Sequence, residues 1–414
     1  MPRSHDSSIA LRDASIVCLS SIDWDFVWQA HHEIMSRLGA AGNKVVFVEN
    51  TGGVRSVRAS DARRLVQRAV NAIRQMLRGD RRPVPNVTVV APLLLPFARN
   101  KIARFVNDRL LTPLMASKIR RMAGPDPIVY TYLPTANALR LIDLIGGRRA
   151  VVVYHSLADY QALAEDPDAM LKTEEELVRR SDLVLVQSAG LRQRFEGLNA
   201  HVFDLGIGVN LSVFDPAKVT EVAVEIRDLP RPVIGYVGGI HEHLDLELLR
   251  ELARNFPGGS VVLVGPFLID QAELPVGPNI HFLGPRAHSE LPPLVAAFDV
   301  GLIPYHRTDF SETVNPTKLF EYLAMGVPVV STDMPEVVSL TLPPFAARTA
   351  GDHATFVAAV RAALVEQAPA DQVRRRELAL DRDWSHIVER LATLIAQRRD
   401  EARTQMAARP IPQS

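Results

Sequence analysis

The feature that constrains the fold most is the alternation of short, almost continuously apolar runs with longer amphipathic stretches. Runs of Val, Ile and Leu with few polar breaks are typical of strands buried on both faces of a parallel sheet. Amphipathic stretches between such runs are typical of covering helices. In the first half this predicts strands at Ser15–Leu19, Val45–Val48, Val87–Val90, Ile128–Tyr132, Ala150–Tyr154, Leu183–Gln187 and His201–Leu205, and helices at Phe26–Leu38, Pro134–Leu144, Leu171–Arg180 and Ala189–Leu198.

The alternation stops at Phe214–Pro232, a stretch with prolines near both ends and little periodicity, which we interpret as a linker. It then restarts, so the chain is predicted to be α/β, with two doubly wound Rossmann-like domains and a cleft between them. The domains would be 1–215 and 216–385, with 386–414 as a C-terminal helix and tail able to cross back to the first. Strands are predicted at Val233–Val237, Val261–Val264, Ile280–Leu283, Val300–Pro304 and Val327–Thr332, and helices at Leu244–Asn255, Ser289–Phe298, Pro316–Met325, Ala354–Glu366 and Trp384–Arg398.

Composition disfavours several classes of protein. Lys and Arg number 47 and so do Asp and Glu, so no global charge attracts nucleic acid. Cys18 is the single cysteine, which leaves no disulfide framework and fits a reducing compartment. The N-terminal stretch lacks the apolar core of a signal peptide, and no apolar run approaches the roughly 18 residues of a membrane-spanning helix. We therefore expect a cytoplasmic protein.

The balanced total hides a basic region, Arg55–Arg121. Nine arginines face two aspartates in residues 55–82, and seven Lys or Arg face one aspartate in residues 99–121. Leu65–Arg78 has helical apolar spacing with arginines on the other face, typical of an element that lies on an anionic membrane. This predicts a peripheral location on the inner face of the plasma membrane. The alternative is a helix packed on its own domain with a solvated arginine face.

The stretch NPTKLFEYLAMGVPVVST, Asn315–Thr332, carries the strongest candidate for a ligand site. Asn315 suits a helix N-cap and Pro316 the first helical position. Gly326 suits the left-handed residue after the helix. The helix follows the carboxyl end of the strand Val300–Pro304, the edge at which doubly wound sheets bind ligands.

Lys318 and Glu321 lie one turn apart on this predicted helix. A helix N-terminus and an ammonium group suit an anion such as a diphosphate. A carboxylate suits a vicinal diol such as a ribose, because it only accepts hydrogen bonds. Phosphate beside ribose indicates a nucleotide. The alternative is a surface Lys–Glu pair on an ordinary helix, and the spacing alone does not decide.

Residues 233–332 resemble the nucleotide-binding domain of the retaining GT-B glycosyltransferases of family 4, or group 1. The similar stretches, in the family's order, are GYVGGIHEHLDLELL, VVLVGP, NIHFLGPRAHSELPPLVAAFDVGLIPY and NPTKLFEYLAMGVPVVST. The resemblance implies that the first domain binds an acceptor and the second a nucleotide sugar. It also implies that Glu321 holds the ribose and that Thr317 and Lys318, beside Asn315, meet the diphosphate.

The chain departs from the family pattern at two places. The family's E-x7-E pair would need an acid at Thr313, so Glu312, one position away, is a weak candidate. The family's Arg and Lys after the first strand of this domain are absent. Gly238 and Gly239 stand there instead and would let the backbone approach a phosphate.

Two further residues of the second domain are candidates. His241, or else His243, can donate a hydrogen bond in place of the missing bases, unless both are solvated loop histidines. In the family the loop that corresponds to Gly284–His288 passes the nucleobase. Arg286 can stack there or be a solvated arginine.

The first domain offers candidates at the same edge of its sheet. His155 follows a buried strand, where the family carries a histidine that faces the donor sugar; the alternative is a packed loop histidine. Asp159 either orients His155, contacts a sugar hydroxyl or begins a helix. Asp23, Trp24 and Asp25 replace a glycine loop of the family. Trp24 would stack on a sugar and the acids would accept from hydroxyls, unless they cap the next helix.

No metal site is predicted, since His31 and His32 have no third ligand at a suitable spacing. The resemblance therefore implies a metal-independent, retaining hexosyltransferase of polysaccharide biosynthesis. It would move a sugar from a nucleotide diphosphate sugar, with no other cofactor, to a glycan or lipid-linked acceptor. A GT-B sugar-nucleotide epimerase and a non-catalytic sugar-nucleotide-binding protein stay open as alternatives. A hydride-transferring enzyme is disfavoured because neither domain has G-x-G-x-x-G after its first strand.

Overall fold

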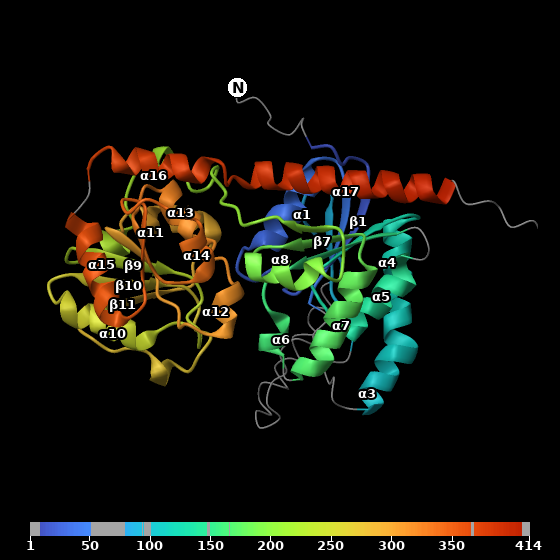
Figure 1. The fold of residues 1–414 in the computed structure, drawn as a ribbon, viewed down its shortest axis with the longest axis horizontal. Helices are drawn as coiled ribbons and strands as arrows, with labels where there is room; N and C mark the ends of the chain where they lie inside the picture. The colour runs from blue at the N-terminus through green and yellow to red at the C-terminus, as the bar shows by residue number, and fades with distance from the viewer. Residues whose placement is uncertain are drawn as a thin grey trace, which may run out of the picture. The chain divides into compact units, whose positions relative to one another are not determined.

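The computed structural model describes residues 9–50, 79–92, 94, 101–146, 150–164, 166–365 and 368–407. The chain forms two compact units, residues 1–205 with 388–414 and residues 206–387 (Figure 1). Residues 206–215, assigned by the sequence to the first domain, lie in the second unit because Ile207, Val209 and Phe214 are buried in its core. The last helix, α17 (Trp384–Ala407), begins in the second unit and continues in the first.

The first unit is built on an eight-stranded sheet in the order β3-β4-β2-β1-β5-β6-β7-β8. Every neighbouring pair is parallel except β3 and β4, which form a hairpin that the sequence did not predict. Its turn places Asn86 at a positive φ of 60°, a conformation that asparagine tolerates. The strands are β1 (Ser15–Leu19), β2 (Lys44–Val48), β3 (Arg81–Val84), β4 (Val87–Val90), β5 (Ile128–Thr131), β6 (Val151–Ser156), β7 (Leu183–Val186) and β8 (Val202–Asp204).

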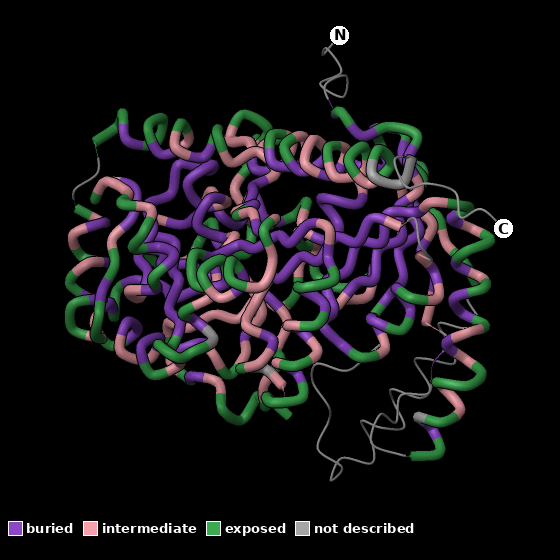
Figure 2. The backbone as a smooth tube through the Cα atoms, turned by 45° about the vertical axis from the view of Figure 1, so that its right-hand side comes forward, coloured by how far each residue is buried: buried purple, intermediate pink, exposed green. Residues whose placement is uncertain are grey.

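Helices pack on this sheet and bury their apolar faces against it (Figures 1 and 2). The basic stretch after residue 100 is one continuous helical segment that the sequence did not assign, and a π-helical turn, η2, lies inside it. The helical elements are α1 (Ala30–Ala40), α3 (Lys101–Val106), η2 (Asn107–Leu111), α4 (Thr112–Ala123), α5 (Ala136–Gly146), α6 (Tyr160–Leu163), α7 (Pro167–Arg180) and α8 (Ala189–Glu196). The predicted helix at Leu65–Arg78 lies outside the described residues.

The second unit has a six-stranded parallel sheet in the order β11-β10-β9-β12-β13-β14. Its strands are β9 (Val233–Val237), β10 (Ser260–Val264), β11 (Ile280–Gly284), β12 (Val300–Ile303), β13 (Val329–Thr332) and β14 (Ala347–Ala350). Its helical elements are η3 (Pro216–Lys218), α9 (Val224–Arg227), α10 (Leu246–Asn255), η4 (Gln271–Glu273), η5 (His288–Glu290), α11 (Leu291–Val295), α12 (Asp309–Thr313), α13 (Lys318–Ala324), α14 (Pro335–Ser339), α15 (His353–Val365) and α16 (Asp371–Leu380).

Two glycines on the central strands of this sheet make room for aromatic rings. Gly235 of β9 and Gly301 of β12 are register partners. A Cβ on Gly235 would lie 2.3 Å from the Phe298 ring, and one on Gly301 would lie 2.5 Å from the Tyr322 ring. Such contacts are too short for any side chain larger than hydrogen. Gly301 therefore lets the helix that carries Tyr322 lie close to the sheet, and Gly235 makes room for Phe298.

The helices of the described part of the chain include none that is both long and apolar enough to cross a membrane.

Candidate active site

The second unit has a topological switch point between β9 and β12. From β9 the chain moves outward through β10 to β11, and from β12 it moves the other way. Ligands of doubly wound sheets bind beyond the carboxyl ends of the strands at such a point. Gly238 and Gly239 directly follow β9, and Tyr305 follows β12. The predicted phosphate loop thus lies where the topology places a ligand.

Lys318 lies at this switch point, in the first turn of α13, and is buried. Its ammonium donates a hydrogen bond to the Tyr305 hydroxyl at 2.6 Å. It also lies 4.8 Å from the centre of the Tyr305 ring and 5.3 Å from that of Tyr236. A buried charge requires such partners. The two tyrosines hold one cation in a fixed position beside the glycine loop.

Gly238 of this loop and Gly265, which follows β10, have no space for a larger side chain. A Cβ on Gly265 would lie 1.9 Å from the carbonyl oxygen of Gly238, and one on Gly238 would lie 3.2 Å from Cε of Lys318. Both glycines have φ near 150°, a backbone conformation that favours glycine. The Tyr236 hydroxyl donates to the carbonyl of Gly239 at 2.9 Å. Backbone, tyrosine and lysine therefore form one close-packed cluster.

His241 belongs to the same cluster. Its ring lies 5.6 Å from that of Tyr305, and its Nδ1 accepts the backbone N–H of His243 at 3.2 Å. That bond leaves Nε2 as the protonated nitrogen of the neutral ring. The structure thus brings together Gly238, His241 and Lys318, which the sequence had selected separately.

Glu321, one turn beyond Lys318, is half-buried and faces the loop that follows β11. Its Oε1 lies 3.7 Å from Nε2 of His288, whose ring contacts Phe214. The sequence placed the nucleobase along this loop but did not select His288. A histidine that precedes a short helix at the ligand edge is the signal that could have identified it.

Three predicted residues have other arrangements. The helix begins at Lys318 with Thr317 as its cap position, and its first turn is closed by i→i+3 bonds to Pro316 and Thr317, so the predicted Asn315 cap is wrong. Asn315 itself is buried. Glu312 is exposed on α12. Arg286 is half-buried and pairs with Glu225 at 3.1 Å, a contact that the sequence did not predict.

The first unit has its own switch point, between β1 and β5. His155, predicted to follow the neighbouring strand, is the last residue but one of that strand, β6. The side chain is 1% exposed, and its Nδ1 lies 2.7 Å from the Tyr130 hydroxyl. Its Nε2 is buried and has no hydrogen-bond partner. Burial lowers the pKa of His155 to about 3. The imidazole is therefore neutral near pH 7 and can exchange a hydrogen bond with a ligand, but it is a poor general base.

His31 is a second buried histidine at this edge, which the sequence did not select as a site residue. Its ring lies 3.8 Å from that of Tyr132, whose other neighbour is His155 at 5.2 Å. Its Nε2 lies 2.9 Å from the Ser21 hydroxyl, and its buried Nδ1 has no hydrogen-bond partner. Among the described residues no group of three or more His, Cys, Asp or Glu side chains is arranged to hold a metal ion.

We expect His31 and His155, two of the three buried histidines described in this unit, to make stability fall at acid pH. Burial lowers the pKa of both, and the nearby charges of His32 and His155 lower that of His31 further. Both titrate near 6.5 when unfolded, so below that pH the unfolded chain binds more protons. Stability present above pH 6.5 should fall as the pH drops, towards pH 3 for His155, by up to about 1.4 kcal/mol per histidine per pH unit. Urea denaturation across this range measures the slope.

The matched comparison for this slope is His155→Phe, which fills the same space without a titratable group. The buried Glu174, with its pKa raised by desolvation to about 7, contributes in the opposite sense, losing stability as pH rises from 4.5 to 7. It is unchanged in the variant, so the difference between the two proteins reports the titration of His155 together with its effect on the pKa of His31. An identical slope in both would show that His155 is not buried as a neutral group.

Side chains of the Asp23–Asp25 loop contact other residues of the first unit. Trp24 is buried among Trp28, His32 and Phe47, and the exposed Asp25 pairs with Arg81 at 2.8 Å. These contacts do not support the predicted sugar-stacking role of Trp24. Asp23 is half-buried, and its backbone carbonyl accepts the N–H of Phe26 at 3.1 Å. Neither acid caps α1, which begins at Ala30 and is capped by Gln29.

Asp159 has a structural position. Its Oδ1 accepts the backbone N–H of Gln161 at 2.9 Å and so caps α6. The same oxygen pairs with Arg194 at 2.9 Å, and Arg194 also pairs with the buried Glu174. Of the predicted alternatives, the helix-initiating acid describes these contacts.

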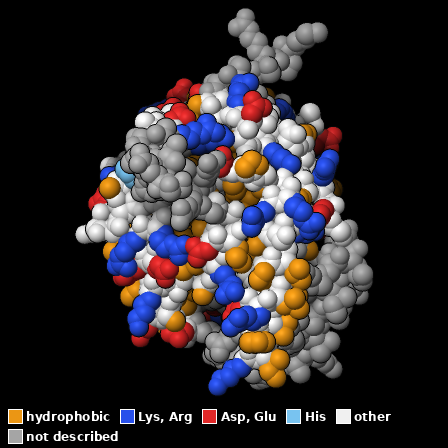
Figure 3. All heavy atoms as spheres, turned by 90° about the vertical axis from the view of Figure 1, so that its right-hand side faces the viewer, with side chains coloured by type: hydrophobic (Ala, Val, Ile, Leu, Met, Phe, Trp, Pro, Cys, Tyr) orange, Lys and Arg blue, Asp and Glu red, His pale blue; other side chains and the backbone are white. Residues whose placement is uncertain are grey.

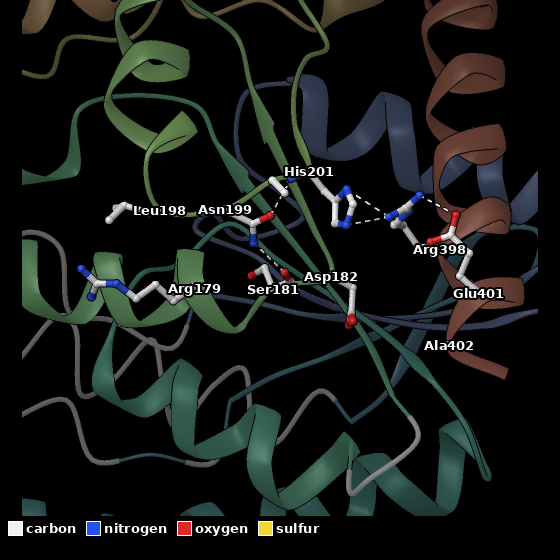
Figure 4. Close-up of a pocket in the computed structure, with 10 residues that line it drawn as sticks. Arg179, Ser181, Asp182, Leu198, Asn199, His201, Arg398, Glu401 and Ala402 are labelled. Atoms are coloured by element: carbon white, nitrogen blue, oxygen red, sulfur yellow. Dashed lines mark hydrogen bonds and ion pairs between the residues drawn. The ribbon is translucent and has the colours of Figure 1, made fainter. Parts of the chain in front are cut away.

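A separate hollow in the first unit, of about 350 Å³, lies at the opposite edge of the sheet. Ser181, Asp182 and His201 line it from the segments that precede β7 and β8. His201 and Arg398 point toward each other, and Arg398 pairs with Glu401 at 2.6 Å (Figure 4). Ligands bind at the carboxyl edge of such sheets, so this hollow is not the candidate site.

Comparison with known proteins identifies part of the chain. Residues 231–366 match the family model of glycosyl transferases group 1. The chain contains a group 1 glycosyltransferase domain. The site around Lys318 and Glu321 lies inside this group 1 domain. TuaH of Bacillus subtilis (strain 168), named as a teichuronic acid biosynthesis glycosyltransferase, is 30% identical over 184 residues. That match covers 43% of this chain and 46% of TuaH, so the chain spans less than half of that relative.

Solved structures show the fold of the group 1 domain and of the first unit. Sucrose-phosphate synthase from Thermosynechococcus elongatus is 15% identical, with a TM-score of 0.68 over 93% of this chain and 98% of that one. HepE of Anabaena, in complex with UDP and glucose, is 14% identical, with a TM-score of 0.65 over 92% and 99%. Trehalose 6-phosphate synthase from Burkholderia multivorans is 15% identical, with a TM-score of 0.63 over 97% and 100%. The chain has two Rossmann-like domains and shares the GT-B fold.

Proposed function

We propose that the protein is a glycosyltransferase that moves a sugar from a nucleotide diphosphate sugar to a glycan or lipid-linked acceptor. The observation that carries the proposal is the ammonium of Lys318, held by Tyr305 and Tyr236 beside the Gly238 loop. A fixed cation at a backbone phosphate loop suits a leaving diphosphate, since preorganised charge stabilises the charge that develops in the transition state. The group 1 match supports the proposal that this leaving group is part of a sugar donor.

The other residues take roles around this centre. Glu321 would accept hydrogen bonds from the ribose, with His288 beside it. His241 would donate from Nε2 to a phosphate oxygen. In the first unit, Nε2 of His155 would contact a sugar hydroxyl as a neutral group.

The reaction itself is proposed to proceed with retention and without a metal. Lys318 and the loop N–H groups supply positive charge to the diphosphate, which is the work a metal ion does in other transferases. The departing phosphate oxygen would take the proton of the acceptor hydroxyl on the same face of the sugar. Activity is therefore expected to survive a chelator, and a loss that divalent metal restores would contradict this part.

The acceptor and donor classes are proposed from the proteins that the chain resembles. TuaH is named for teichuronic acid biosynthesis, so a polysaccharide or its lipid-linked precursor is the first acceptor class to test. The structure of HepE holds UDP and glucose, so UDP-sugars come first in a donor panel. Peripheral membrane location, predicted from the basic region, is likewise a proposal.

The donor site is tested by calorimetry with a panel of nucleoside diphosphates and their sugars. Glu321→Ala should weaken nucleotide-sugar binding about tenfold, since a hydrogen bond to a charged group contributes about 1.5 kcal/mol. Lys318→Ala should weaken diphosphate binding more than nucleoside binding. Glu377→Ala, which removes an exposed acid of α16, is the matched control. Unchanged affinity in both site variants would remove the assignment, and product analysis separates transfer from epimerisation.

A further inference from the structure

The helical segment α3–η2–α4 exposes an apolar stripe on the first unit. Ile102 is 74% exposed, Phe105 64%, Leu110 54% and Leu114 51%. The same segment buries Met115, Ala116, Ile119 and Ala123 in the core. It is therefore apolar on two sides, and packing within the described part of the unit uses only one of them. Such an exposed stripe marks an interaction surface.

The π-helical turn aligns the four residues of the apolar stripe. They are spaced three, five and four residues apart. A spacing of five leaves the face of a regular α-helix, but the stripe crosses η2, where the N–H of Thr112 bonds to the carbonyl of Asn107, five residues earlier. That wider turn returns Leu110 to the side of Phe105, because π-helical turns are longer than α-helical ones.

Positive charge accompanies the apolar stripe. Residues 101–123 contain six Lys or Arg and one acid, Asp108, in a chain whose total charge is zero. Lys101, Arg109 and Arg121 are exposed, and the Arg109 guanidinium lies 5.9 Å from the centre of the Phe105 ring. Figure 3, which views the side of the molecule where Figure 1 places α3 and α4, shows hydrophobic side chains gathered beside Lys and Arg.

We propose that this segment docks the protein on a membrane surface rich in anionic lipid. The apolar stripe would enter the boundary between headgroups and acyl chains, while the flanking cations contact lipid phosphates. Apolar residues and cations on one exposed face are the combination that interfacial helices use. A partner that were only acidic would not need the apolar residues, and one that were only apolar would not need the cations.

The apolar stripe lies within the basic region Arg55–Arg121, from which the sequence predicts an anionic membrane surface, and is separate from the amphipathic basic helix predicted at Leu65–Arg78. Insertion of the apolar stripe adds a hydrophobic component to the free energy of membrane binding, and salt does not screen that component. The inference does not depend on the proposed glycosyl transfer, because docking is measured without donor or acceptor.

The experiment is co-sedimentation of the full chain with phosphatidylcholine vesicles, with and without phosphatidylglycerol. The wild type should sediment with the anionic vesicles only and keep part of its binding at high salt. Ile102→Ser, Phe105→Ser and Leu114→Ser combined should lower affinity at least tenfold. The matched control is Leu268→Ser, Val276→Ser and Val365→Ser, three exposed apolar residues of the second unit, which should bind as the wild type. Circular dichroism checks the fold of both.

Two further variants keep the test decisive if the triple variant unfolds. Arg109→Glu with Arg121→Glu should abolish binding to anionic vesicles at low salt. In Phe105→Trp, the fluorescence of the new tryptophan should be quenched by brominated lipid, which reports insertion of the apolar stripe. Equal binding by the triple variant and the wild type, or no binding of the wild type to either vesicle, would overturn the proposal. A concentration-dependent dimer that the triple variant abolishes, without vesicle binding, would make the stripe an interface between copies.

Discussion

Replacing Lys318 by methionine is expected to lower kcat by about a hundredfold or more. Methionine keeps a flexible apolar stem between Tyr236 and Tyr305 but removes the ammonium. Removal of one preorganised group that stabilises developing charge costs about 10²- to 10³-fold in other enzymes. Steady-state kinetics with saturating donor measures the effect, and the melting temperature checks that the fold survives.

Two variants refine this prediction. Tyr305→Phe removes the 2.6 Å hydrogen bond to Lys318 but leaves the charge, and should cost about tenfold. Lys218→Met, at an exposed lysine of the same unit, is the matched control and should have no effect on turnover. A Lys318→Met enzyme with near wild-type kcat would show that the buried ammonium serves packing and not the leaving group.

His155→Phe is expected to lower turnover more than tenfold while the protein stays folded. The ring volume is kept, but the unpartnered Nε2 and the contact from Nδ1 to Tyr130 are lost. Because the pKa of His155 is lowered to about 3, its ionisation should not appear in the pH dependence of kcat/KM near neutrality. Parallel measurements of rate against pH on both proteins test the role.

Tyr130→Phe provides the contrast for His155. It removes the hydroxyl beside Nδ1 and leaves Nε2 in place, so a smaller loss is expected. Near wild-type rates in His155→Phe would return the histidine to a packing role. A wild-type pH profile with an inflection near 6.5 that disappears in His155→Phe would instead make it a proton-transfer group.

Strand positions were predictable from the sequence because each central strand is buried on both faces and reads as an apolar run. Ser15–Leu19 and Val233–Val237 have the predicted bounds. The edge strand Arg81–Val84 has an exposed, basic sequence with a proline, so no apolar pattern marks it. The segment 101–123 was interpreted as a basic run because its helical periodicity is shifted by the π-helical turn.

The candidate site was predictable where its residues share one helix or loop. Lys318 and Glu321 are linked by spacing within α13, and Gly238 and Gly239 by their position after β9. The tertiary fold brings Lys318 into contact with Tyr236 and Tyr305, and Glu321 with His288. Short-range spacing in the sequence does not predict such contacts. His31 was likewise not predictable as a site residue, since it lies on α1 and is connected to His155 only through the ring of Tyr132, which follows β5.

The register pair Gly235 and Gly301 sets a rule for engineering this chain. Tyr322 fills the space beside Gly301, and its hydroxyl accepts the N–H of Val237. The helix with Lys318 and Glu321 is thereby fastened to the strand that leads into the glycine loop. Libraries that aim at a new donor should therefore vary rim positions such as His241 and His288. Members with a side chain at Gly301 would push Tyr322 and its helix away from the sheet, and members with one at Gly235 would clash with Phe298. Both kinds would be lost at the folding step.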